Sequence, residues 1–144
     1  MRRALLAIIA IAGLSVPVIA SAAGKRHVHF TTKVVGAGIS ANKAAYQLHD
    51  SHFGNGAGVQ TVKVKGSGGT DTEISYYGNA TARSKGTFTL GPPDANGIAT
   101  LTGSGHDVSG TGKAAGLKST YTYTGTLNTK TGLFHVTLTG TYTF

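Results

Sequence analysis

Polar and apolar residues alternate strictly along two stretches in the C-terminal part of the chain. Tyr121 and Tyr123 alternate with threonines over residues 120–124. The same alternation returns over residues 133–144, where the apolar positions are Phe134, Val136, Leu138, Tyr142 and Phe144. A two-residue period places the two sets on opposite faces of a β-strand. The pattern predicts a sheet with one apolar face and one threonine-rich face.

The rest of the chain after residue 26 alternates in the same way between turn signals. Glycine-rich or proline-containing stretches interrupt it at residues 50–58, 66–69, 91–97 and 128–132. Sequential hairpins at this spacing predict an all-β fold, an eight-stranded antiparallel up-and-down β-barrel. The glycine-rich segment 106–112 is expected to be a bulged or bent strand. An immunoglobulin-like sandwich is the alternative, disfavoured by the absence of tryptophan and cysteine.

The N-terminus has the layout of a secretory signal peptide. Two arginines follow Met1, an apolar run covers residues 4–18, and Ala20-Ser21-Ala22 matches a cleavage site. We therefore expect a cleaved signal peptide over residues 1–23 and one barrel domain over residues 24–144. The expected location is secreted, either extracellular or periplasmic, and export by the general or the twin-arginine route stays open. The apolar run is short for a membrane span, so no integral membrane protein is expected.

Charge narrows the range of partners. Without Arg2 and Arg3 the chain has 11 basic and 5 acidic residues, a formal charge of +6. This excess favours anionic partners such as cell-wall polymers. Nucleic acid is not expected, because the basic residues are scattered along the chain and the protein is predicted to be exported. No cysteine is present, so a well-filled core has to stabilise the domain.

Aromatic side chains predicted to face the barrel interior are the candidate ligand-binding residues. They are Tyr46, Tyr76, Phe88, Tyr121, Tyr123 and Phe134. Rings combined with hydroxyl groups suit a small hydrophobic molecule in the lumen. The alternative is that the rings simply fill the core.

Histidines provide no convincing metal site. His27 and His29 share one face of a predicted strand, a spacing that suits a metal ion, but they alternate with inward apolar residues and therefore point to solvent. No metal and no cofactor are predicted.

The segment 108–116, Val-Ser-Gly-Thr-Gly-Lys-Ala-Ala-Gly, resembles the glycine-rich motif of dirigent proteins, with Ala114 at the motif's aromatic position. Dirigent proteins share the allene oxide cyclase barrel, an eight-stranded calycin-like fold. The resemblance covers most of residues 27–144 in the order of its parts and about ten residues in motif. It implies the same barrel, association into homo-oligomers, and an activity as a cofactor-free isomerase or cyclase.

An enzyme of that type needs an acid and a base. Asp50 together with Tyr46, and Glu73, the only glutamate, are the weak catalytic candidates. Since other catalytic signatures are absent, the sequence favours a secreted, non-catalytic barrel that binds a small hydrophobic molecule. The cofactor-free isomerase and a structural protein of the cell envelope are the alternatives.

Overall fold

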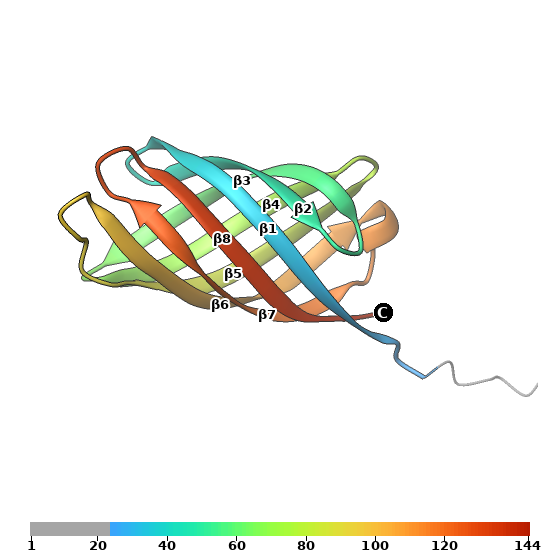
Figure 1. Ribbon diagram of the computed structural model, residues 1–144. Coiled ribbons are helices and arrows are strands. Elements are labelled where there is room, and N and C mark those ends of the chain that lie inside the picture. The colour runs from blue at the N-terminus through green and yellow to red at the C-terminus, as the bar shows by residue number, and fades with distance from the viewer. Residues whose placement is uncertain (1–23) are drawn as a thin grey trace, which may run out of the picture.

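Eight antiparallel strands form one closed barrel in the computed structural model, which describes residues 24–144 (Figure 1). The strands are β1 (His27–Ser40), β2 (Lys43–Asp50), β3 (Gly54–Lys65), β4 (Gly68–Tyr77), β5 (Ala80–Leu90), β6 (Ile98–Thr111), β7 (Lys118–Asn128) and β8 (Leu133–Thr143). A short 3-10 helix, η1 (Gly112–Ala114), follows β6. The predicted all-β barrel is confirmed, whereas the predicted signal peptide lies outside the described residues.

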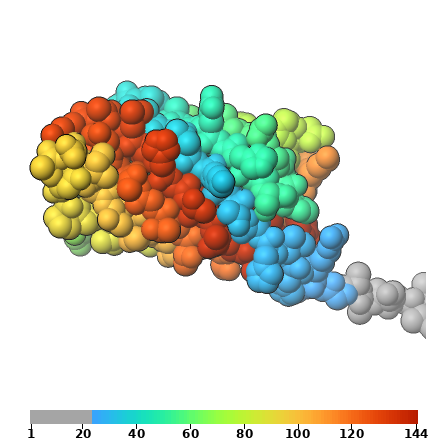
Figure 2. All heavy atoms as spheres, in the orientation of Figure 1, coloured from blue at the N-terminus to red at the C-terminus, as the bar shows by residue number. Residues whose placement is uncertain are grey.

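Each strand pairs with the next one in sequence, and β8 closes the barrel on β1. One end of the barrel, which we call the closed end, carries the connections β2–β3, β4–β5 and β6–β7 together with the C-terminus (Figure 1). The opposite end, which we call the mouth, carries the four remaining hairpin loops. The outer wall is continuous on the side where β1 and β8 face the viewer (Figure 2). No helix within residues 24–144 has the length and apolar character needed to cross a membrane.

Short turns fix the register between neighbouring strands. Gly66 and Gly78 each open a two-residue connection and have φ angles of 61° and 62°. Type II′ turns need a positive φ at this position, which glycine adopts without steric cost. The predicted irregularity near residue 108 is also present, as a register shift that leaves Val108 without a partner opposite Arg83 and Ser84.

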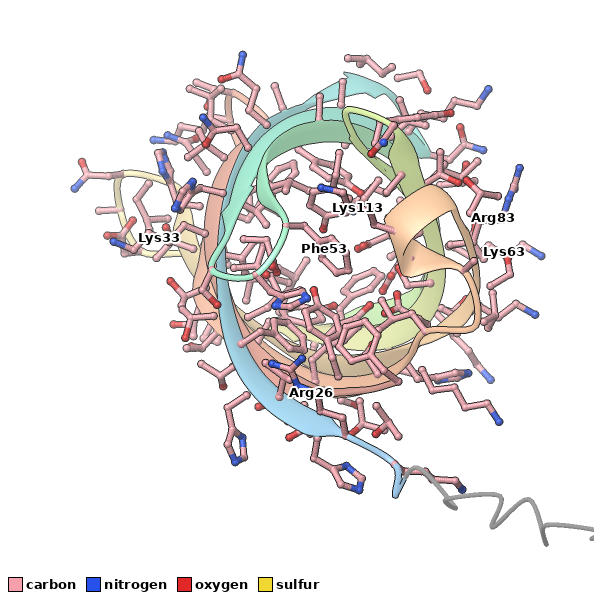
Figure 3. The ribbon with its side chains drawn as sticks, turned by 90° about the vertical axis from the view of Figure 1, so that its right-hand side faces the viewer. Arg26, Lys33, Phe53, Lys63, Arg83 and Lys113 are labelled. Atoms are coloured by element: carbon pink, nitrogen blue, oxygen red, sulfur yellow. The ribbon has the colours of Figure 1, made fainter. Side chains whose placement is uncertain are left out.

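Apolar side chains close one end of the barrel. Phe30, Tyr121 and Tyr142 pack there with Ala114 and Leu117 from the β6–β7 connection. The rings of Phe30 and Tyr142 stack with centroids 3.9 Å apart. Phe53, from the β2–β3 loop, lies over this end within the ring of strands (Figure 3). This apolar plug seals the closed end.

Glycines on the inner wall make room for tyrosine rings from the neighbouring strand. Gly58 is paired with Tyr46, and Gly103 with Tyr123. A Cβ at Gly103 would lie 2.3 Å from both the Thr87 carbonyl oxygen and the Tyr123 ring. These aromatic rings therefore lie across the backbone of a glycine instead of filling the lumen.

Gly103→Ala is expected to lower the free energy of unfolding by about 1–3 kcal/mol, because the added methyl group displaces both the ring and the backbone. Gly38→Ala is the matched control: nothing lies within 4 Å of its Cβ position. The control should be neutral or slightly stabilising. Urea unfolding compares the two, and equal stability of the variants would contradict this account.

The prediction that Tyr76, on β4, faces the barrel interior was wrong. Tyr76 is 48% exposed on the outer wall. Asp71, Glu73, Ser75 and Tyr77 line the lumen instead. Paired residues of antiparallel strands share a face, and the two-residue turn pairs Val64 with Gly69 and Val62 with Asp71. Since Val62 and Val64 point inward, the register forces Asp71 and Glu73 inward too.

Candidate functional site

The lumen contains a cavity of about 290 Å³ lined by residues of all eight strands. It reaches the mouth, where Gly38, Ser40, Ala41, Lys43 and Gly132 line it. None of the connections at the closed end contributes to its lining. The volume is near the lower limit of pockets that hold small organic molecules. The barrel is therefore hollow, and its cavity is open at the mouth and sealed at the closed end.

Between its rim, which carries Ser40 and Lys43, and the middle of the lumen, the cavity wall is largely apolar. Its lining residues there are Val62, Val64, Phe88, Leu90, Leu101, Leu127, Phe134 and Val136. These side chains come from β3, β5, β6, β7 and β8, close to the ends that those strands present to the mouth. This region can accept an apolar group without leaving polar atoms unpaired.

A band of polar side chains crosses the middle of the lumen, and we call it the polar girdle. It consists of Tyr46, Asp71, Glu73, Ser75, Ser84, Asp107, Tyr121 and Tyr123. The hydroxyl groups of Tyr46 and Ser75 are 2.9 Å apart. The Ser84 hydroxyl donates a hydrogen bond to Glu73 Oε2 at 3.2 Å, and the hydroxyl oxygen of Tyr123 lies 3.5 Å from Asp71 Oδ1. The carboxyl groups of Asp71 and Glu73 are within hydrogen-bond reach of each other.

Two buried polar atoms of the girdle are not satisfied by the protein's donors and acceptors. Asp71 is 4% exposed, and no hydroxyl, amide or cationic group reaches its Oδ2 atom. Tyr121 is 7% exposed, and its hydroxyl approaches Ser84 without the geometry of a hydrogen bond. Buried polar atoms are normally paired, so both are available to a ligand.

Burial raises the pKa values of the girdle's carboxyl groups. The pKa of Glu73 rises from an ordinary 4.5 to about 8, mainly by desolvation and then by the negative charge of Asp71. Desolvation also raises the pKa values of Asp71 and Asp107. Two neighbouring carboxyl groups without a cationic partner share a proton more readily than they both ionise. The pair Asp71–Glu73 can therefore carry a proton at neutral pH.

Asp50 has a structural position, and it does not line the cavity. Its Oδ1 atom accepts hydrogen bonds from the backbone amides of His52 and Phe53, at 2.8 and 2.9 Å. Its Oδ2 atom accepts from the hydroxyl groups of Thr32 and Tyr142. The expected pairing of Asp50 with Tyr46 was wrong, because Tyr46 bonds to Ser75 instead. Asp50 anchors the β2–β3 loop to the closed end.

Five of the six aromatic residues predicted to face the interior line the cavity: Tyr46, Phe88, Tyr121, Tyr123 and Phe134. Tyr76 does not, and Tyr77 takes the inward position next to it. Of the two catalytic candidates, only Glu73 lines the cavity. The sequence reasoning missed Asp71, Ser75, Ser84 and Asp107 as lining residues. A two-residue turn at Gly66-Ser67 fixes the register between β3 and β4. Recognising that turn in the sequence would have identified the two missed residues on β4, Asp71 and Ser75.

The histidines predicted to face solvent do so. His27 and His29 lie on the outer wall and contact Thr143 and Thr141 of β8. Within the described part of the chain, no group of three or more histidine, aspartate or glutamate side chains could hold a metal ion.

Charges are sorted between the inside and the outside of the barrel. Asp50, Asp71, Glu73 and Asp107, four of the five acidic residues, point inward. Every lysine and arginine of residues 24–144 is exposed. Lys33, Lys63 and Arg83 point away from the ring of strands (Figure 3). The lumen is therefore acidic inside a basic outer wall.

Comparison of the chain with models of protein families, with curated proteins and with solved structures gives no match.

Proposed function

We propose that this protein is a secreted, non-catalytic binding protein that holds a small, largely apolar molecule in its barrel. The observation that carries the proposal is the cavity of about 290 Å³ that reaches the mouth. Eight-stranded barrels have interiors that are either filled by side chains or able to hold one small ligand. A cavity with apolar walls and a few polar groups is the usual form of a small-molecule site.

Small side chains on the inner wall support the proposal. Ala44, Ala82, Ser75 and Ser84 line the cavity at positions where larger apolar residues would close it. A barrel selected only for stability would fill this volume, since every cavity of this kind forgoes packing contacts. The hollow interior therefore lowers the stability of the folded protein, and ligand binding would offset this loss.

A neutral fluorescent probe, N-phenyl-1-naphthylamine, tests the proposal, because its emission rises in apolar surroundings. The wild-type protein should bind it in a saturable way. Val136→Trp puts a large ring into the cavity and should weaken binding on the order of ten-fold or more, about 1.4 kcal/mol. Thr137→Trp adds the same ring at an exposed position on the outer wall and should leave binding unchanged. Absence of saturable binding, or equal loss in both variants, would refute lumen binding.

A cofactor-free isomerase or cyclase of the allene oxide cyclase or dirigent type is the second candidate. It is favoured by the position of Asp71 and Glu73 in the cavity beside the Tyr123 hydroxyl. A carboxyl group with a pKa near neutrality suits proton transfer. The two functions differ in the fate of the bound molecule, which a binding protein releases unchanged and an isomerase converts. Mass spectrometry of a ligand recovered after incubation distinguishes them.

A further inference from the structure

We propose that the polar girdle selects a ligand with a cationic head, a small amphiphile whose protonated amine lies against Asp71 and Glu73 while its apolar part extends toward the mouth. This inference rests on the proposed function and names the chemical class of the ligand. Four observations carry it: the order of surfaces along the lumen, the sorting of charge, the unsatisfied atoms, and the proton held by the carboxyl pair.

The order of surfaces along the lumen fits an amphiphile in one orientation. On β4, Glu73 and Asp71 lie in the middle of the strand, and β3 and β5 carry Val64 and Leu90 toward the mouth. The apolar plug of Phe30, Tyr121 and Tyr142 closes the barrel on the other side. A molecule that enters through the mouth therefore meets apolar walls first and the carboxyl groups deeper in the cavity.

The charge of the lumen selects the sign of the head group. Asp71, Glu73 and Asp107 line the cavity, and their hydrogen-bond partners in the protein are hydroxyl groups and one another. Lys43, at the mouth, is the one cationic side chain among the described residues that line it. Buried carboxylates need an opposite charge or several donors, and an ammonium group supplies both. An anionic head would be repelled.

The unsatisfied atoms mark where the head binds. Asp71 Oδ2 is a buried acceptor to which no hydroxyl, amide or cationic group of the protein extends, and the Tyr121 hydroxyl is a second unpaired group in the same girdle. An ammonium group has three donors. An ammonium group can therefore donate one hydrogen bond each to Asp71 Oδ2, a Glu73 oxygen and the oxygen of the Tyr121 hydroxyl. An alcohol has one donor and leaves at least one acceptor unpaired.

The carboxyl pair also predicts a proton signature. Without ligand, the pair holds a proton near neutral pH, since the pKa of Glu73 is about 8. A cation beside the pair lowers both pKa values, so the proton leaves to the buffer when an amine binds. The titratable groups around the pair are Tyr46 on β2, Tyr77 on β4, Asp107 on β6, Tyr121 and Tyr123 on β7, and Lys43 at the mouth. The tyrosines have raised pKa values, which leaves the carboxyl groups as the source of the proton.

Displacement of N-phenyl-1-naphthylamine at pH 7 by octylamine, octanol and octanoate, which share one apolar chain, tests the inference. In the wild type, octylamine should displace the probe at a concentration about ten-fold below that of octanol, and octanoate should be weakest. In the double variant Asp71→Asn with Glu73→Gln, the advantage of octylamine over octanol, both measured on that variant, should fall to about two-fold or less. Asp94→Asn removes an exposed carboxyl group outside the cavity and should keep the wild-type order.

Calorimetry in buffers with different ionisation heats supplies a second measurement. Octylamine binding to the wild type should release a proton, whereas octanol binding should not. Probe and octanol binding without an advantage for octylamine, or with octanoate preferred, would overturn the cationic head and leave lumen binding intact. Retention of the octylamine advantage in the double variant would overturn the role of the carboxyl pair. Failure of the probe and of all three competitors to bind would refute the proposed function and this inference with it.

Discussion

Replacing Asp50 by alanine should lower the free energy of unfolding by roughly 3–5 kcal/mol, because buried hydrogen-bond donors lose their acceptor. Asp50 is 1% exposed and accepts four hydrogen bonds. Its loss leaves the Thr32 and Tyr142 hydroxyl groups unpaired beneath the β2–β3 loop. Urea unfolding followed by circular dichroism measures the effect.

Asp94→Ala is the matched control for this prediction. Asp94 Oδ1 accepts two backbone amides in the β5–β6 loop, from Asn96 and Ile98, as Asp50 Oδ1 does from His52 and Phe53. Asp94 is exposed, however, so water replaces it and the loss should be about 1 kcal/mol. Asp50→Asn keeps one acceptor and should fall between the two alanine variants. If Asp50→Ala and Asp94→Ala lose the same stability, the network does not anchor the closed end.

The stability of the protein should fall as the pH rises from about 4.5 to 8. Glu73 has a pKa of about 8 in the folded protein against an ordinary 4.5, so between these values the folded state holds more protons than the unfolded chain. Stability is therefore highest below this window and declines through it. At about 1.4 kcal/mol per pKa unit, and reduced because Glu73 keeps some exposure to the water-accessible cavity, the decline should be roughly 2–4 kcal/mol. Asp71 and Asp107 shift in the same direction and add to it.

Urea unfolding at several pH values measures this decline, and Glu73→Gln isolates its source. The variant cannot ionise at residue 73, so it should be more stable than the wild type at pH 8 and similar to it at pH 4.5. Asp94→Asn should follow the wild-type curve, since its carboxyl group is exposed. A wild-type stability that rises from pH 5 to pH 8, or a decline that persists unchanged in Glu73→Gln, would contradict the assignment of Glu73 to the lumen.

The residues that line the cavity show which inward-facing positions the hydrophobic pattern of the sequence predicts correctly and which it does not. On β7 and β8, tyrosine and phenylalanine alternate with threonine, so hydrophobicity alone assigned Tyr121, Tyr123 and Phe134 to the interior, where the structure places them. On β4 the alternation offers Ile74 and Tyr76 on one face and Glu73 and Ser75 on the other. Hydrophobicity predicts that the face with Ile74 and Tyr76 lies inside the barrel. In the structure, the face with Glu73 and Ser75 lies inside instead. Pairing with β3 and β5 overrides the preference of β4 itself.

The sequence by itself determined that the chain forms antiparallel strands and where most of them turn. These features follow from local periodicity and turn chemistry, which the chain carries residue by residue. Only the tertiary structure decided that the lumen is hollow and acidic and that Asp71 and Glu73 meet there. Those properties depend on strand register and on the room left by glycines such as Gly58 and Gly103 beside tyrosine rings. Both arise only when neighbouring strands pair in a fixed register and all eight close into one ring.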